Sequence, residues 1–348
     1  MKLDKRDYKG KEVFVGIDVH KKSYAVAAVC EGVLVKNWSM KANPKQLVEQ
    51  LKRFFEGAQI QSVYEAGFSG FSLHRFLNSK GIKNIVVNPG SIATRANSRV
   101  KTDKKDAKKM SQHLSKSLLR CIYIPSEEVE DRRSLTRGRD QVVKRRQAIG
   151  NQIKMKIYYL GLFISDARIS ESYMKEVELL ELSAGHKMIL EELVEAWRTE
   201  TDRIKRFNKA LSEQAKVDKL ETIYRSAPGV GVISSRILSN ELGDMSRFDN
   251  EKQLSSSTGL TPSEYSSGEH VRKGHLTRQG SPQIRAILVE IAWRAIREDR
   301  NLFEIYHRIK NRREGKRAIV AVARKILIRL RKCLKDRILW QDLGPLMG

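Results

Sequence analysis

Apolar runs of strand length, separated by turn residues, dominate the first quarter of the chain. The first run, from Val13 to Val19, is apolar and rich in β-branched residues, as in a strand buried on both faces. We predict strands at 12–19, 23–30 and 33–38, with Glu31-Gly32 as the turn between the second and third. This spacing is typical of an antiparallel meander.

Helical and strand patterns then alternate. Residues 44–56 are predicted to form a helix, because Pro44 lies near its start and Leu47, Leu51 and Phe54 share one face. The next elements are a strand over 60–64 that ends at Glu65, a helix around 73–77 and a strand over 85–87. The order β-β-β-α-β-α-β predicts a mixed sheet with helices packed on it.

The middle of the chain is long, helical and basic. A first helix is predicted from about 125 to 161, and a second helical stretch over about 172–216. The second carries a heptad seam, interrupted at Glu200, of Leu190, Leu193, Trp197, Ile204, Phe207 and Leu211. Two structures fit this seam: a helix packed on its own chain, as in a hairpin, or a dimerising coiled coil.

The composition changes again near Tyr224. The stretch 226–231, Ser-Ala-Pro-Gly-Val-Gly, resembles a helix–hairpin–helix turn whose amides approach a DNA phosphate, although a plain turn between helices has the same pattern. Residues 254–280 are rich in Ser, Gly and Thr and are predicted to form a loop. Residues 308–332 are predicted to form a basic amphipathic helix, with an apolar stripe of Ile319, Val322, Ile326, Leu330 and Cys333.

These patterns predict an α/β plus all-α fold with three domains. Residues 1–124 would form the mixed sheet, 125–219 a helical coiled-coil domain and 220–348 a mostly helical C-terminal domain.

The charge balance identifies the partner class. The 67 Lys and Arg residues exceed the 41 Asp and Glu residues, which leaves a net charge of +26 and favours nucleic acid as the partner. We find no apolar run near membrane-spanning length and no signal-peptide pattern, so no membrane is expected. The three cysteines are far apart, lack zinc-ligand spacing and fit a reducing cytoplasm.

Four acids stand out in this basic chain. Asp18 lies inside the first buried strand, where an unpaired carboxylate costs several kcal/mol and therefore needs a cation, a donor or a metal. Glu65 ends the fourth strand, and ligands of open α/β sheets collect outside strand ends. Asp103 and Asp106 open a helix predicted to run to about Leu119, and their spacing places them on one face. A solvated surface turn is the alternative for this pair.

A convergence of the four acids would suit a divalent metal. Carboxylate oxygens are the ligands that Mg²⁺ prefers, and Mn²⁺ also accepts them. Two such ions activate the attacking oxygen and stabilise the leaving oxygen in phosphoryl transfer. The metal would also neutralise an acidic cluster that otherwise repels DNA.

Basic residues and serines complete the candidate site. The helix after 125 carries either a phosphate-contacting face or only a solvated charged face, formed by Arg132, Arg133, Arg137, Arg139, Lys144, Arg145 and Arg146. Further cations surround the serine-rich loop, at Arg272, Lys273 and Arg278. A serine among cations can act as a nucleophile toward a phosphodiester, but the spacing does not choose among Ser255, Ser256, Ser257, Ser263, Ser266 and Ser267.

The motifs together resemble a known family. The N-terminal ones are Gly16-Ile17-Asp18-Val19, Tyr64-Glu65-Ala66 and Lys101-Thr102-Asp103 through Asp106-Ala107. The C-terminal ones are Pro228-Gly229-Val230-Gly231, Gly259-Leu260-Thr261-Pro262, Ser267-Gly268 and Arg278-Gln279-Gly280. In this order they resemble the DEDD transposases of the bacterial insertion-sequence family that includes the Piv invertases. The best-understood members of that family are recombinases guided by a bridge RNA.

The resemblance implies a RuvC-like, RNase H-type N-terminal domain and a C-terminal transposase domain. It implies that Asp18, Glu65, Asp103 and Asp106 hold Mg²⁺, and that Ser267 attacks the DNA phosphate to form a phosphoserine link. Ser266 is adjacent, so this assignment carries an ambiguity of one residue. Arg278 stands where many members carry Lys. The resemblance also implies donor and target DNA, a noncoding RNA, a homo-oligomer from dimer to tetramer, and the bacterial nucleoid as the location.

Two other functions fit the same residues. A RuvC-like structure-specific endonuclease would use metal-activated water without serine chemistry. A basic nucleic-acid-binding protein with an inactive RNase H fold would need none of the acids.

Overall fold

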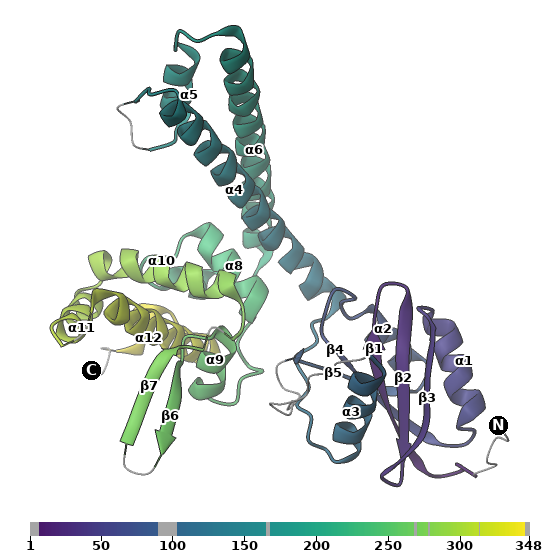
Figure 1. The fold of residues 1–348 in the computed structure, drawn as a ribbon. Helices are drawn as coiled ribbons and strands as arrows, with labels where there is room; N and C mark the ends of the chain where they lie inside the picture. Colours follow the sequence, from purple (N-terminus) through teal and green to yellow (C-terminus); the bar gives the residue numbers. More distant parts are fainter. Residues whose placement is uncertain are drawn as a thin grey trace. The chain divides into compact units, whose positions relative to one another are not determined.

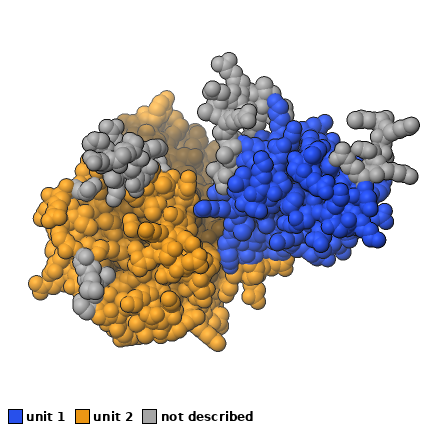
Figure 2. All heavy atoms as spheres, turned by 90° about the horizontal axis from the view of Figure 1, so that it is seen from below, with its two compact units in different colours: residues 1–125 blue, residues 126–348 orange. Residues whose placement is uncertain are grey.

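The computed structural model describes residues 7–89, 103–164, 168–267, 270–277, 279–312 and 314–344, and for 264–267 and 270–273 the backbone alone. It divides the chain into two compact units, Met1–Pro125 and Ser126–Gly348, which Figure 2 colours blue and orange. We call them the N-terminal unit and the C-terminal unit. The residues on both sides of the predicted domain boundary near 219 belong to the C-terminal unit. A separate domain boundary there stays a prediction.

The N-terminal unit is built on a five-stranded mixed sheet. Its strands are β1 (Glu12–Val19), β2 (Ser23–Cys30), β3 (Val33–Lys41), β4 (Gln59–Glu65) and β5 (Lys83–Val87). The order across the sheet is β3-β2-β1-β4-β5; β2 is antiparallel to both neighbours, and β1, β4 and β5 are parallel. This confirms the predicted mixed, RNase H-like sheet. The third strand is longer than predicted, because Ser39–Lys41 continue to pair with the start of β2.

Helices cover both faces of this sheet (Figure 1). One face buries Val13, Val15 and Ile17 of β1 against α1 (Pro44–Phe54) and α2 (Ser72–Ser79). The side chain of Asn43 caps α1 by accepting a hydrogen bond from the amide of Gln46. The other face is covered by α3 (Asp103–Ser115), whose buried residues Met110 and Leu114 pack on Phe14 and Val63.

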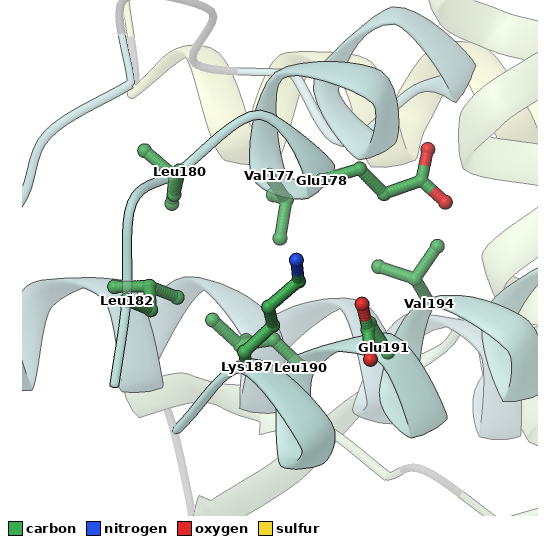
Figure 3. Close-up of a pocket in the computed structure, with 8 residues that line it drawn as sticks. All are labelled: Val177, Glu178, Leu180, Leu182, Lys187, Leu190, Glu191 and Val194. Carbon is green, nitrogen blue, oxygen red and sulfur yellow. The ribbon is translucent and has the colours of Figure 1, made fainter. Parts of the chain in front are cut away.

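The C-terminal unit begins with a helical hairpin. Helices α4 (Glu127–Tyr159) and α6 (Ala184–Val217) run side by side, with α5 (Glu171–Glu178) at the tip (Figure 1). The single helical stretch predicted over 172–216 is therefore wrong, since the chain leaves the helix between α5 and α6. This break lets α5 bury Tyr173, Met174 and Val177 against the long helices. Figure 3 shows Val177 pointing toward α6 at this tip.

The heptad seam of α6 faces α4 of its own chain. The buried positions of the seam are Leu190, Trp197, Ile204 and Leu211, and Glu200 is buried among them. The Glu200 carboxylate accepts hydrogen bonds from Arg145 of α4 and from Arg203. Of the two predicted alternatives, the structure thus shows the helix packed on its own chain.

The rest of the unit is a helical bundle with one β-hairpin. Its elements are α7 (Glu221–Ser226), α8 (Val232–Leu242), α9 (Glu251–Thr258), β6 (Pro262–Ser267), β7 (His270–Leu276), α10 (Pro282–Glu298), α11 (Arg300–Lys310), α12 (Gly315–Asp336) and a 3₁₀ turn (Trp340–Leu343). One apolar core joins these helices and includes the whole predicted stripe of α12. Two predictions are corrected: much of the serine-rich segment forms the antiparallel hairpin β6–β7, and the last helical stretch is divided between α11 and α12.

A buried charged cluster fixes the start of the bundle. The fully buried guanidinium of Arg236 in α8 pairs with Asp218 at 2.7 Å and with Glu221. Ser235 and Ser239 donate further hydrogen bonds to these two carboxylates. Buried charges are tolerated when they are paired and hydrogen-bonded in this way.

Among the described residues, no helix is long and apolar enough to cross a membrane.

Candidate active site

Two of the predicted acids lie at one edge of the sheet and on one face. The register of the parallel strands β1 and β4 places Ile17 opposite Tyr64, and Asp18 and Glu65 are the next residue on each strand. Side chains alternate along a strand, so Asp18 shares a face with Phe14, and Glu65 shares a face with Val63. Phe14 and Val63 belong to the face that α3 covers.

Small residues allow α3 to approach this face closely. A Cβ atom at Gly16 would lie 2.1 Å from the carbonyl oxygen of Ala107, which is much closer than real atoms come. On the neighbouring strand, Ala25 and Ala27 pair with Asp18 and Gly16 and pack together with Ala107. The small residues Gly16, Ala25 and Ala27 therefore let α3 pack closely on the sheet, and the first turn of α3 lies beside Asp18.

The first turn of α3 carries the other two acids. Asp103 and Asp106 lie where the helix dipole favours carboxylates, which stabilises this turn. His20 Nε2 lies 3.2 Å from Asp18 Oδ2 and 3.2 Å from Asp103 Oδ2. The imidazole therefore connects the strand acid to the helix acid.

The surroundings of Asp18 perturb its proton affinity. Its side chain is 22% exposed, against 64% for that of Asp103. The pKa of Asp18 is raised, chiefly because burial disfavours the charged form; the charges of Asp103 and Asp106 also raise it, whereas His20 opposes the shift. A cation beside these carboxylates would stabilise their charged forms.

The described residues include one group with metal-ligand geometry. One ligand atom each from Asp18, His20 and Asp103 can be chosen so that all three lie within 4.8 Å of one another. Two carboxylate oxygens and an imidazole nitrogen are a suitable donor set for Mg²⁺ or, better, for Mn²⁺, which accepts nitrogen more readily. The residues at this edge thus fit a divalent metal.

His20 is the site residue that the sequence reasoning missed. It follows β1 two positions after Asp18 and so belongs to the same face. That spacing is the signal that would have found it. Glu65 lies outside this closest group, at the same edge of the sheet.

The predicted serine lies in the other unit. Ser266 and Ser267 are the last two residues of β6, opposite Val271 and His270 of β7. Their backbone is described and their side chains are not. The geometry therefore does not choose between them.

Comparison with known proteins identifies the family. Residues 15–157 match a DEDD transposase family profile, and residues 221–308 match a profile described as "Transposase IS116/IS110/IS902 family". The y4qE protein of Sinorhizobium fredii is 30% identical over 82% of this chain and 72% of its own length. The transposase for insertion sequence element IS1533 of Leptospira borgpetersenii is 26% identical over 94% of this chain and 96% of its own.

The chain belongs to the IS116/IS110/IS902 family of transposases.

The four acids and the two candidate serines of this transposase lie in different family profiles. The DEDD profile spans β1 to α4 and contains Asp18, Glu65, Asp103 and Asp106. A DEDD domain implies a divalent metal, in agreement with the donor set around Asp18. The second profile contains Ser266 and Ser267. The protein is thus a DNA transposase, and DNA is its partner.

Part of the predicted phosphate-contacting face of the transposase has another role. Arg133 is buried and donates to the carbonyl oxygens of Asn240 and Glu241 in α8. Its assignment to DNA is wrong, because the charge run in the sequence does not reveal a partner more than a hundred residues away. Arg137 pairs with the Glu241 carboxylate, and Arg139 donates to Asn208.

The other predicted contacts divide into three groups: residues paired within the fold, an exposed residue, and residues whose side chains are not described. Arg145 is half-exposed and held by Glu200, and Lys144 pairs with Asp140 one turn away. Arg132 is exposed, so it is open to a phosphate. Arg272 and Lys273 lie on β7 without described side chains, and Arg278 lies outside the described residues.

The predicted helix–hairpin–helix turn is a packing element. A Cβ atom at Gly229 would lie 2.6 Å from the carbonyl oxygen of Ile291 in α10, so this turn presses against that helix. The Gly229 amide donates to Glu298 at 2.6 Å. Of the two sequence interpretations, the plain connecting turn is the one observed.

Proposed function

We propose that this transposase cuts and rejoins DNA with a Mg²⁺ site of Asp18, Glu65, Asp103 and Asp106 and with Ser267 as the nucleophile. The observation that carries the metal site is the convergence of Asp18, His20 and Asp103 within metal-ligand distance in a DEDD domain. Ser267 is supported by its motif position and by the family profile that contains it.

The proposed reaction consists of two successive phosphate-ester exchanges. The Ser267 oxygen attacks the phosphorus, forms a phosphoserine ester and releases one DNA end, whose oxygen takes up the proton that the serine lost. A hydroxyl of another strand then attacks the phosphoserine, which restores the serine and joins the new strand. Asp18, Glu65, Asp103 and Asp106 would hold the divalent metal, which would stabilise the charge on the attacking and leaving oxygens.

We further propose that a noncoding RNA directs the reaction and that the active assembly is a homo-oligomer, from dimer to tetramer. The family resemblance supports both, and the net charge of +26 is compatible with a large polyanion. The acids and Ser267 belong to different compact units, an arrangement that suits sites composed from more than one protomer.

A cleavage assay separates this function from its alternatives. Labelled DNA spanning the junction of the insertion element would be incubated with the protein, Mg²⁺ and RNA copied from the flanking sequence. We expect Asp103→Asn and Ser267→Ala each to abolish strand exchange, while Asp202→Asn, an exposed acid on α6, retains it.

Each alternative has its own outcome in the same assay. A nuclease that uses water would keep cutting after Ser267→Ala. An inactive binding protein would show no change with Asp103→Asn. Ser266→Ala, tested in parallel, resolves the ambiguity of one residue.

A further inference from the structure

A groove lies between the base of the β6–β7 hairpin and the start of α12, with a volume of about 690 Å³. Its apolar lining includes Leu276, Ile309 and Val320. Three cations of α12 line it: Lys316, Arg317 and Arg324. We call it the hairpin groove.

These three cations are available to a ligand. All three are exposed, and among the described residues none accepts a hydrogen bond from their side chains. Other cations of the same helix are occupied in the fold. Arg329 donates to the carbonyl oxygens of Trp340 and Gly344, and Arg331 donates to Phe248 and Asp249.

The helix geometry arranges the free cations along the groove. Lys316, Val320 and Arg324 are each four residues apart and share one face of α12 beside the buried stripe, with Val320 partly buried against the core. Two turns of helix separate the outer cations by about 12 Å. At about 3.4 Å per stacked nucleotide, that length matches about three nucleotides of one strand.

We propose that the hairpin groove binds a single strand of DNA close to the phosphate that is cut. The outer cations would contact phosphates about three nucleotides apart, and the apolar lining would contact sugars and bases. A groove of this volume has the size of a small-molecule pocket, which admits a strand more readily than a duplex.

The location of the groove supports DNA as the occupant. Leu276 and His275 of β7 line the groove, and β7 pairs with β6, which ends at Ser267. The six residue steps from His270 to Leu276 span about 20 Å of extended strand. The bound strand would thus lie about six nucleotides from Ser267, and in this respect the inference rests on the proposed function.

One acid also lines the groove. Glu314 comes just before α12 and reduces the local charge without cancelling three cations. The net charge of these four side chains is positive, as binding of a phosphate backbone requires.

The test is a binding titration with the full-length protein. Fluorescence anisotropy would follow a labelled single-stranded DNA 12-mer, its RNA equivalent and its duplex. The test variant is Lys316→Ala/Arg324→Ala. The matched control, Lys332→Ala/Lys335→Ala, removes the same charge from exposed positions of the same helix. Thermal unfolding would verify that both variants fold.

We expect the test variant to bind single-stranded DNA about tenfold or more weakly, and the control to bind as the parent does. Losing two phosphate contacts should also reduce the slope of log affinity against log salt by about 1.4. Equal losses in both variants would overturn the proposal, because they would reveal only general charge attraction. A loss confined to RNA would overturn the assignment to DNA.

The binding readout is independent of the serine chemistry. Ser267→Ala should leave single-strand binding unchanged, so failure of the nucleophile assignment and failure of the groove assignment are distinguishable.

Discussion

Gly16→Ala tests whether the close approach of α3 builds the metal site. The added Cβ would lie 2.1 Å from the carbonyl oxygen of Ala107, 2.7 Å from the amide nitrogen of Ser111 and 3.0 Å from the Cβ of Met110. Two of these atoms are backbone, so no side-chain rotation relieves the clash. The first turn of α3 has to move away from β1.

The structure gives the size of the effect. Ordinary van der Waals contact begins at 3.4 Å, so the helix has to retreat by at least about 1.3 Å. Overpacking of this kind costs about 1–3 kcal/mol of the free energy of unfolding. The same shift separates Asp103 from Asp18, whereas metal–ligand distances tolerate only about 0.2 Å. We therefore expect metal affinity to fall about tenfold or more, equivalent to about 1.4 kcal/mol of binding.

Two measurements check this prediction: calorimetric titration with Mn²⁺ and the midpoint of thermal unfolding. Gly67→Ala is the matched control, because its Cβ meets nothing within 4 Å and it belongs to the same unit. A folded Gly16→Ala protein with unchanged Mn²⁺ affinity would refute the reasoning, since metal binding would then not depend on the close packing of α3 on Gly16.

Three further predictions follow from the same contacts. His20→Gln should weaken Mn²⁺ binding more than Mg²⁺ binding, and the nitrogen coupling in the pulsed EPR spectrum of bound Mn²⁺ should disappear; persistent coupling would exclude His20 as a ligand. Because burial raises the pKa of Asp18, protonation should compete with metal as pH falls and begin above the usual aspartate range; a loss of affinity confined to that usual range would contradict this. Arg236→Met should destabilise the protein by about 3–5 kcal/mol in denaturant unfolding, since it leaves the buried Glu221 and the partly buried Asp218 without their partner; a loss below 1 kcal/mol would disagree.

Much of the N-terminal unit follows from local pattern. The strands at 12–19 and 23–30 are apolar runs bounded by turn residues, and the structure has them at those positions. The break between α5 and α6 was missed, because it depends on burial of Tyr173 and Met174 across the hairpin tip. The β6–β7 hairpin was missed because its serines and glycines also suit a loop.

In the site, too, some features follow from local sequence and others depend on distant contacts. Asp18 and Glu65 are visible in the sequence, because each lies at the end of a predicted strand. The contribution of Gly16 depends on a helix some ninety residues later, and no local pattern reveals it. Arg133 shows the opposite error, since a charge run suggested DNA while the fold uses the guanidinium to join α4 to α8.

The central claim is that the metal-binding acids and Ser267 act together in one reaction. The most direct measurement is a denaturing gel of labelled junction DNA with protein, Mg²⁺ and the flanking RNA, followed by peptide mapping of any protein-linked DNA. We predict a linked band that maps to Ser267 and is absent in Asp103→Asn, without Mg²⁺ and without the RNA. Cleavage without a linked band, surviving Ser267→Ala, would contradict the serine mechanism and favour a nuclease that uses metal and water alone.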